Sequence, residues 1–451
     1  MQEYDFLLMY EHKVRELDNL CLLKYELDKR GYKTKILYEN DYELIKSRTV
    51  VYKTKVLVVG YCYTSSSIKD YASYRIKFDK VVNLQWEQVI TNEQEKDSNS
   101  FRNLSGLAKE IVHISWGERN RRRLIEKAGV TPDHVKVTGN ITMDLLRPEF
   151  KGFYLSRDEI CERYELPTDK KICLFIAGFK YVEASEEARR ATIARFGEGR
   201  RRYLEEAERE QLTILGWFRQ FLEEHKDCVI VYRPHPGDGS PRAEKMAEND
   251  KNFRVISELS VKQWIVISDL VYAWNSTAIL EAYFAGKNPM HLCPYPIPED
   301  QSHPLLMKMN RITDYDTFSR SASGQQVDLG LTKEIVNPFY LVDDGKASYE
   351  EVYRDDAYAL NRRQQRAYKR LYSLRERVVI AFMGNSFLYR IYGWLLRHVP
   401  LPFLQRRRQW LEEYQDKEFD RWKKMNAIEA GDGGEAEKII CKIGALLQEG
   451  R

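Results

Sequence analysis

Residues 228–236 read CVIVYRPHP, a buried-type strand that runs directly into an arginine, a histidine and two prolines. The β-branched residues Val229, Ile230 and Val231 favour a strand, and the prolines fix the backbone where that strand ends. In open α/β sheets, ligands bind at the carboxyl ends of the strands. The stretch therefore predicts a strand of an α/β sheet that presents Arg233 and His235 at its ligand-binding edge.

Strand-like and helix-like patterns alternate on both sides of this stretch. The expected strands are 4–10, 33–38, 56–60, 80–84 and 111–115 in the first half and 171–177, 228–232, 253–256, 270–274 and 290–293 in the second. The expected helices are 15–29, 118–128, 204–225, 261–268, 276–285 and 436–448. Strands that alternate with helices predict parallel sheets covered on both faces. We expect residues 311–342 to be an irregular connection.

The composition fits a folded protein with at least two cores. The chain has 451 residues, of which 43% are hydrophobic and 31% charged. Its seven cysteines are scattered singly without a CxxC pair, which argues against a disulfide framework and favours a reducing cytoplasm. No apolar run is long enough to cross a bilayer. The chain also lacks a GxxxxGK[ST] loop, a GxSxG elbow and a GxGxxG after a strand, so kinase, serine-hydrolase and dehydrogenase functions lack their minimum parts.

Positive charge is concentrated near the C-terminus. The net charge is only +4, yet residues 361–410 carry twelve lysines and arginines against the single acid Glu376. Apolar and aromatic residues alternate with these arginines, as in helices that lie in the plane of an anionic membrane surface. The alternative is that Phe387, Trp394 and Leu395 dock on the rest of the protein while the arginines are solvated. Nucleic acid is an unlikely partner, since no nucleic-acid-binding signature accompanies the charge.

A second motif, LVYAWNSTAILEA, spans residues 270–282. A strand gives way to Asn275, Ser276 and Thr277 at the start of a predicted helix, where free amide groups and hydroxyls favour an anion. Glu281 lies one turn inside that helix, within reach of a ribose hydroxyl. Together with Arg233 and His235, these groups suit a phosphate or diphosphate. An ordinary helix cap and a rigid proline turn are the alternative explanations.

The pair RPHP and strand-NST-helix resembles the nucleotide-binding half of GT-B transferases, including sialyl-, polysialyl- and Kdo transferases that use CMP-sugars and CDP-glycerol glycerophosphotransferases. The segment 137–144, VTGNITMD, is similar to one that leads into the second domain of several GT-B proteins. With NLQWEQ, RPEFKG, IAGF and NSTAILEA, residues 4 to about 296 resemble bacterial surface carbohydrate biosynthesis proteins. The resemblance implies two Rossmann-like domains that face each other across a cleft.

The resemblance also implies roles for individual residues. His235 and Pro236 would bind the donor phosphate, and Ser276 and Thr277 would complete that contact. Gly178, after the first strand of the second half, would let the backbone approach the donor diphosphate. The expected domains are an acceptor domain at 1–147, a nucleotide-donor domain at 148–345, a basic helical region at 346–426, and a linker with a short terminal helix at 427–451.

Two strand ends in the first domain offer a catalytic base. Glu87 in NLQWEQ, residues 83–88, is flanked by two glutamines and an indole, a costly polar cluster if it has no ligand. Glu11, followed by His12, lies after the first strand and is the rival. His113 is expected to be structural. The acidic motif of sialyltransferases is not evident, so the identity of the base stays open between Glu87 and Glu11.

The resemblance, together with the phosphate-binding groups of the second domain, implies a glycosyltransferase of bacterial surface polysaccharide biosynthesis. We expect it to transfer a sugar from a nucleotide-activated donor, with a CMP-sugar favoured, to a glycan or lipid-linked acceptor. No metal motif is present, so no metal and no cofactor beyond the donor substrate are expected. The alternatives are a glycerophospho- or phosphoribosyl-type transferase, a nucleotide-sugar epimerase, and a noncatalytic scaffold recruited to the membrane. The expected location is the cytoplasm, either free or peripheral on the inner face of the membrane.

Overall fold

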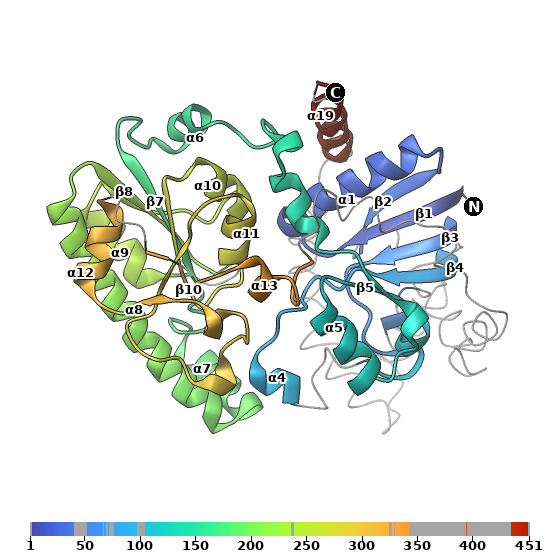
Figure 1. Ribbon diagram of the computed structural model, residues 1–451, viewed down its shortest axis with the longest axis horizontal. Coiled ribbons are helices and arrows are strands. Elements are labelled where there is room, and N and C mark those ends of the chain that lie inside the picture. Colours follow the sequence, from blue (N-terminus) through green and yellow to red (C-terminus); the bar gives the residue numbers. More distant parts are fainter. Residues whose placement is uncertain are drawn as a thin grey trace. The chain divides into compact units, whose positions relative to one another are not determined.

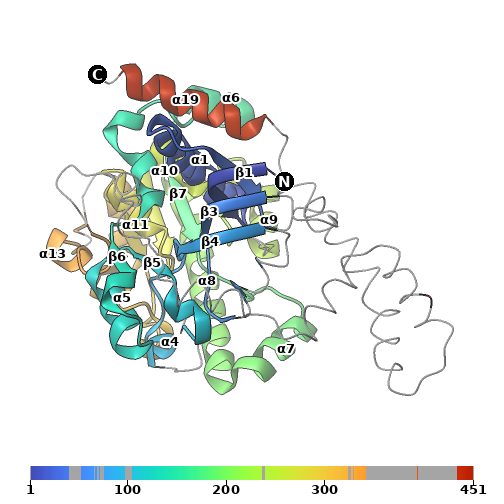
Figure 2. The same cartoon turned by 90° about the vertical axis from the view of Figure 1, so that its right-hand side faces the viewer.

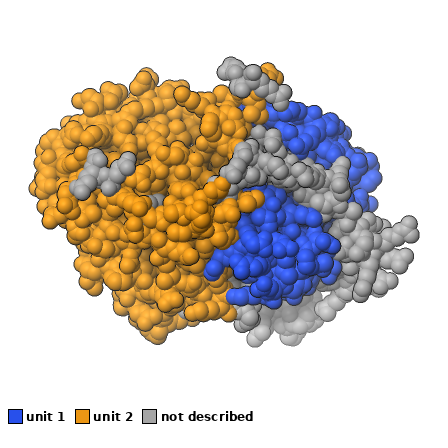
Figure 3. Space-filling model, in the orientation of Figure 1, with its two compact units in different colours: residues 1–88, 101–142, 343–445 blue, residues 89–100, 143–342, 446–451 orange. Residues whose placement is uncertain are grey.

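The computed structural model describes most of the chain outside a long segment near the C-terminus. The described residues are 2–39, 52–65, 67–68, 71, 76–96, 104–235, 239–323, 327–328, 330–341, 394 and 434–449. Contacts between Cα atoms divide the chain into two units, coloured separately in Figure 3. Unit 1 comprises residues 1–88, 101–142 and 343–445, and unit 2 comprises 89–100, 143–342 and 446–451. Each unit is described by itself below.

Unit 1 is built on a six-stranded parallel sheet in the order β2-β1-β3-β4-β5-β6 (Figure 1). Its strands are β1 (Gln2–Tyr10), β2 (Thr34–Tyr38), β3 (Tyr52–Val59), β4 (Ile76–Asn83), β5 (Val112–Ser115) and β6 (Val135–Val137). Leu7 and Met9 face one apolar layer with Leu57 and Val59. The alternate residues of β1 face the other layer, where helix α1 (Lys13–Lys29) packs on β1 and β2.

Unit 2 is built on a second six-stranded parallel sheet, in the order β12-β11-β10-β7-β8-β9. Its strands are β7 (Lys171–Ala177), β8 (Cys228–Arg233), β9 (Phe253–Val255), β10 (Leu270–Trp274), β11 (Met290–Leu292) and β12 (Arg311–Ile312). Phe175, Tyr232 and Tyr272 lie in one core with Phe218 and Phe318 from the covering helices. The alternate residues face α10 and α11, which contact β7 and β10. Two parallel sheets covered on both faces confirm the predicted α/β class with two Rossmann-like units.

The remaining helices mostly connect these strands. They are α4 (Asn92–Lys96), α5 (Glu118–Arg122), α6 (Arg157–Tyr164), α7 (Glu186–Phe196), α8 (Glu198–Glu224), α9 (Pro241–Asn249), α10 (Val261–Ile267), α11 (Ile279–Phe284), α12 (Tyr315–Ala322), α13 (Lys333–Val336) and α19 (Glu435–Glu449). The long α8 places Leu204, Ile214 and Phe221 at helical spacing against the sheet. Ser156 and Glu159 close a capping box at the start of α6.

The expectation of an irregular connection over 311–342 is wrong. β12 adds a short strand at the edge of the sheet beside β11, and α12 follows it. The side chain of Asp314 accepts a hydrogen bond from the backbone N–H of Thr317 and so caps α12. Phe318 then buries its ring in the core of unit 2. Two residues are too short a strand to leave a periodic signal in the sequence.

The first part of the terminal helix α19, up to residue 445, belongs to unit 1 and lies beside α1 (Figure 2). Its Ile443 is fully buried, and the thiol of Cys21 on α1 donates to the carbonyl of Ala436. Gly444 allows close contact, because a Cβ there would lie 3.0 Å from the ring of Tyr25. The predicted basic helical region, 346–426, lies outside the described residues apart from Trp394. Among the helices that the structure describes, none is long and apolar enough to span a bilayer.

Candidate functional site

The strand order of unit 2 reverses between β7 and β10, its topological switch point. Gly178 follows β7 at this point, and its N–H donates to the carbonyl of Trp274 at 3.1 Å. A Cβ on residue 178 would lie 2.5 Å from that carbonyl oxygen. The glycine is thus required by the approach of β10 itself. The chain itself thus explains why residue 178 is a glycine, and the predicted approach of a diphosphate to Gly178 stays a prediction.

Asn275 directly follows β10 at the same switch point. It adopts a left-handed backbone conformation with φ of 41°, which is uncommon for a residue other than glycine. Its Nδ2 donates to the Tyr203 hydroxyl at 3.4 Å, and its backbone N–H points to Nε2 of His291 at 3.5 Å. Burial lowers the pKa of His291 to about 4, so the ring is neutral and Nε2 can accept. The buried Oδ1 of Asn275 has no partner in the described part of the chain.

Arg233 lies at the end of β8, as predicted, but its guanidinium is turned inward. Nη1 donates to the carbonyls of Ile256 and Glu258, and Nη2 donates to those of Ser257 and Leu259, at 2.7–3.2 Å. The side chain is buried, and burial lowers its pKa to about 10, so it stays charged at neutral pH. All four Nη hydrogens therefore hold the loop after β9. The predicted donation to a phosphate does not fit this geometry, and Arg233 is a positioning residue.

The other residues of the predicted donor site lie along the same edge of the sheet. His235 is half-buried two residues after β8, and Pro236 lies outside the described residues. Ser276 and Thr277 are half-buried in the turn after β10. The Ser276 hydroxyl accepts from the N–H of Ala278 at 3.4 Å. Helix α11 begins only at Ile279, so the prediction of a helix starting at residue 276 is wrong.

Two carboxylates of unit 2 are buried near this edge. Burial raises the pKa of Glu281, while Lys262 and Arg233 lower it; its Oε2 is inaccessible and has no hydrogen-bond partner among the described residues. Glu210 on α8 accepts the backbone N–H of Tyr295 at 3.0 Å, and burial raises its pKa to about 7. Glu210 was missed by the sequence analysis. Its signal is that it falls on the apolar stripe of α8, between Ala207 and Ile214.

The strand order of unit 1 reverses between β1 and β3. Glu11 follows β1, and Gly60 follows β3. The indole of Trp86 packs directly on Gly60, because a Cβ on residue 60 would lie 2.4 Å from the indole Nε1. The N–H of Trp86 donates to the carbonyl of Gly60 at 3.1 Å, so the NLQWEQ segment continues alongside the end of β3. This arrangement brings the two predicted bases to one edge.

Both candidate bases are partly exposed at this edge and each is close to a basic group. Glu87 is 44% exposed and lies 3.9 Å from Nη1 of Arg15. Glu11 is 39% exposed, and its Oε1 lies 3.6 Å from Nε2 of His12. Arg15 also approaches Glu16, with Nη2 at 3.6 Å from Oε1. The structure thus gathers the two residues that the sequence offered as alternatives, linked through the start of α1.

Glu16 is a buried carboxyl group at the same switch point. Only 2% of the residue is exposed, and its Oε2 accepts the backbone N–H of Glu11 at 2.8 Å. Burial raises its pKa to about 7, against the lowering effects of the Glu11 amide and Arg15. Glu16 can therefore hold or release a proton near neutral pH. Sequence analysis missed it, although it lies on the helical stripe that continues through Leu20, Leu23 and Leu27.

His113 is structural, as expected. It is fully buried, its Nε2 lies 2.7 Å from the carbonyl oxygen of Ala108, and its Nδ1 lies 3.3 Å from Nδ2 of Asn83. Burial lowers its pKa to about 4, so the ring is neutral. It links the end of β4 to the segment before β5 and leaves no nitrogen for a substrate.

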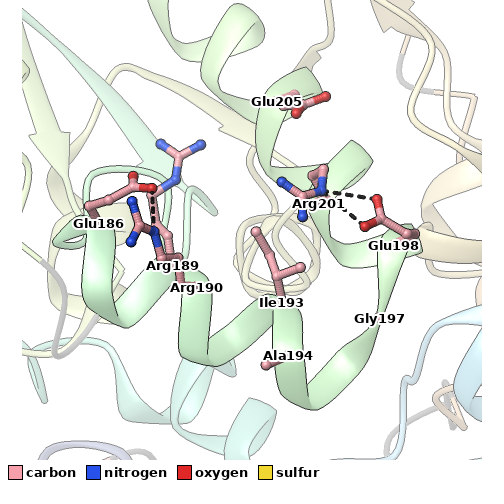
Figure 4. Close-up of a pocket in the computed structure, with 9 residues that line it drawn as sticks. All are labelled: Glu186, Arg189, Arg190, Ile193, Ala194, Gly197, Glu198, Arg201 and Glu205. Carbon is pink, nitrogen blue, oxygen red and sulfur yellow. Dashed lines mark hydrogen bonds and ion pairs between the residues drawn. The ribbon is translucent and has the colours of Figure 1, made fainter.

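Two other features of the described residues bear on ligand binding: their capacity to hold a metal ion and a groove in unit 2. Among the described residues, no three His, Cys, Asp or Glu side chains gather as a metal would require; the expected absence of a metal stays a prediction. A groove of about 720 Å³ lies between α7 and α8 (Figure 4). Several of its charges pair with each other, as Arg190 does with Glu186 and Arg201 with Glu198. We assign no ligand to it.

The Arg233→Lys variant tests the positioning role of the guanidinium. One ammonium group cannot reach four carbonyls spread over residues 256–259, so buried acceptors lose their donors. We expect the free energy of unfolding in urea to fall by at least about 2 kcal/mol. The control is Arg254→Lys, because Arg254 donates to one carbonyl in the described part of the chain, that of Glu165 at 3.3 Å. Equal small losses in both variants would contradict the role.

The Glu16→Gln variant tests the buried carboxyl group. The folded-state pKa of about 7 lies above the ordinary 4.5, so the folded protein binds more protons between these values. The stability that the protonated carboxyl contributes is present below pH 4.5 and is lost as the pH rises to 7. We expect the wild type to lose about 3 kcal/mol relative to Glu16→Gln across this window. Parallel stability curves from pH 4.5 to 8 would show that Glu16 does not titrate there.

Known proteins resemble this chain in structure, but neither family models nor curated sequences match it. Similar solved structures include an S. aureus MnaA–UDP complex, with 14% identity and a TM-score of 0.47 over 78% of this chain and 95% of that one. A Methanocaldococcus jannaschii UDP-GlcNAc 2-epimerase in complex with UDP-GlcNAc and UDP has 11% identity and a TM-score of 0.46, over 78% and 98%. The wall teichoic acid polymerase TagF has 12% identity and a TM-score of 0.47, over 77% and 86%. At these values, the function has to be argued from this chain's own residues.

Proposed function

We propose that the protein is a glycosyltransferase of bacterial surface polysaccharide biosynthesis that takes its sugar from a nucleotide-activated donor. One observation carries the proposal: at the switch point of unit 2, Asn275 leaves the sheet in a left-handed turn, and no described residue satisfies the buried oxygen of its side chain. A buried polar atom without a partner calls for an explanation, and a bound ligand supplies one. An open α/β sheet binds nucleotides at this point of its strand order.

The donor side of the proposed site belongs to unit 2. By the resemblance stated above, His235 and Pro236 bind the donor phosphate, with Ser276 and Thr277 completing the contact. Glu281 is assigned to a ribose hydroxyl. Arg233 acts through the loop after β9, whose four carbonyls it holds in place. Asn275 is oriented by two hydrogen bonds: its backbone N–H donates to the neutral ring of His291, and its Nδ2 donates to the Tyr203 hydroxyl.

The acceptor side belongs to unit 1, where Glu11 or Glu87 serves as the base. In a direct, inverting displacement the acceptor oxygen attacks the anomeric carbon, its proton passes to the carboxylate, and the bond to the nucleotide phosphate breaks. A base needs hydrogen-bond reach and a pKa suited to the operating pH. Glu11 and Glu87 are both partly exposed, so an acceptor hydroxyl can reach either carboxylate. The acceptor is a glycan or a lipid-linked glycan, and a CMP-sugar is the favoured donor.

A thermal-shift panel of the purified protein tests the donor site. The ligands are CMP, CDP, UDP, GDP, dTDP and phosphoribosyl diphosphate, each without metal and then with magnesium. We expect a selective rise in melting temperature with a cytidine nucleotide, since binding to the folded state alone stabilises it by about 2.7 kcal/mol at 100 times the Kd. His235→Ala should abolish the rise, whereas the control Arg190→Ala in the α7–α8 groove should keep it.

Three other outcomes separate the alternatives. A selective shift with another nucleotide would keep the transferase and change its donor. An altered nucleotide-sugar formed without any acceptor would favour an epimerase. Absence of a shift with every nucleotide would contradict the proposed function and favour the scaffold.

A further inference from the structure

The two glutamines of NLQWEQ have opposite environments. Gln88 is buried and all of its amide hydrogen-bonding capacity serves the fold. Its Nε2 donates to the carbonyls of Leu84, Gln85 and Ile114 at 2.9–3.4 Å, and its Oε1 accepts from the Trp116 N–H and the Asn120 amide, both at 2.8 Å. Gln88 thereby ties the end of β4 to the end of β5. Its role is structural.

Gln85 is fully buried as well, yet its side-chain amide forms no hydrogen bond with any described residue. Its backbone is held, since its N–H donates to Oδ1 of Asn83 at 3.1 Å and its carbonyl accepts from Gln88. Neither its Nε2 nor its Oε1 has a partner among the residues that the structure describes. A buried primary amide without hydrogen bonds loses its hydration and gains nothing in return. Natural proteins rarely keep such a group without a use for it.

The backbone at Gln85 is strained in addition. Its φ is 51°, in the left-handed region that favours glycine. Flanking hydrogen bonds impose this conformation: the N–H of Leu84 donates to Val59, and that of Trp86 donates to Gly60. Strain that the surroundings maintain is typical of ligand-binding positions.

Trp86 adds a third polar atom that lacks a partner. Its indole Nε1 is inaccessible and no described residue accepts its hydrogen. The indole packs on Gly60, and the carboxyl oxygen of Glu16 lies within 4 Å of the same point, the Cβ position of residue 60. Gln85 and Trp86 are consecutive residues at the carboxyl edge of the sheet, next to the candidate base Glu87. The segment after β4 thus presents three different groups in a row: the amide of Gln85, which can donate and accept, the indole N–H of Trp86, which donates, and the carboxyl group of Glu87.

We propose that Gln85 and Trp86 bind hydroxyl groups of the sugar ring on the acceptor, an inference that rests on the proposed glycosyl transfer. A sugar hydroxyl both donates and accepts, so two neighbouring hydroxyls match the amide oxygen and amide N–H of Gln85. The indole N–H of Trp86 donates to a third oxygen. An anionic ligand is disfavoured, because Glu11, Glu16 and Glu87 line the same edge against Arg15 and His12. A neutral, hydroxyl-rich ligand fits this set of groups.

The first experiment compares Gln85→Met with Gln88→Met in the absence of ligand. Methionine conserves the volume and flexibility of glutamine and removes its hydrogen-bonding groups. If the Gln85 amide forms hydrogen bonds only with a ligand, its removal costs the ligand-free protein nothing, and Gln85→Met melts at or above the wild-type temperature. Gln88→Met should melt several degrees lower, because it breaks the bonds between the ends of β4 and β5. A fall in Gln85→Met equal to that in Gln88→Met would overturn the proposal, since the amide would then be part of the fold through a buried water.

The second experiment measures binding directly, by saturation-transfer NMR of the full chain with the methyl glycosides of glucose, galactose, mannose and N-acetylglucosamine. We expect at least one glycoside to bind the wild type, and Gln85→Met and Trp86→Phe to bind it roughly tenfold more weakly, as the loss of one hydrogen-bonded contact predicts. Undiminished binding by both variants, or no binding by the wild type, would overturn the subsite. Nucleotide-induced thermal shifts in the same variants should be unchanged. A wild type that no nucleotide stabilises would instead overturn the proposed function.

Discussion

The approach of β7 to β10 at Gly178 is the constraint on which the nucleotide edge of unit 2 depends. The Gly178 N–H donates to the Trp274 carbonyl, and no side chain fits between the two strand ends. This contact continues the parallel pairing of the two strands past their last residues. Asn275 must then leave the sheet at once, in a left-handed turn. The reversal of strand order at this point leaves its side chain at the sheet edge, where a ligand can meet it.

The switch point of unit 1 also depends on a glycine contact, but the polar groups around it differ from those of unit 2. Gly60 lets the Trp86 indole lie on the end of β3, and the buried carboxyl of Glu16 fixes the Glu11 amide at the end of β1. Carboxylates therefore gather at this edge, whereas the edge of unit 2 presents His235, Asn275 and hydroxyl groups. This division suits a reaction in which one unit holds a nucleotide and the other accepts a proton from a hydroxyl.

The strands and long helices could be predicted because their apolar patterns match their burial. Residues 171–177 and 270–274 appear as strands with the same limits in the structure. The strand β12 was missed for a physical reason: its two residues are too few to show a period. The helix α11 was predicted, but it begins at Ile279 and not at residue 276. The helix α7 lies within a stretch, 183–202, whose many charges conceal its pattern.

The candidate site was predictable in its location and less so in its roles. Strand ends rich in polar residues indicated both edges, yet the sequence cannot show where a side chain turns. Arg233 has a guanidinium that could bind a phosphate, but its Nη atoms donate to four backbone carbonyls that follow β9. Glu16 and Glu210 lie on the apolar stripes of their helices and are buried, but a carboxylate in a helix is usually solvated, so the sequence did not indicate their burial. Gln85 and Gln88 share one motif, and only the structure separates the idle amide from the satisfied one.

Hydrogen–deuterium exchange of the full chain with and without saturating CMP or CDP tests the central claim most directly, namely that the carboxyl edge of the unit 2 sheet binds the nucleotide. The account predicts slower exchange in peptides covering 174–182 and 272–280, the two sides of the switch point, and no change in 186–198 along the α7–α8 groove. Protection confined to the groove, or unchanged exchange on both sides of the switch point, would contradict it.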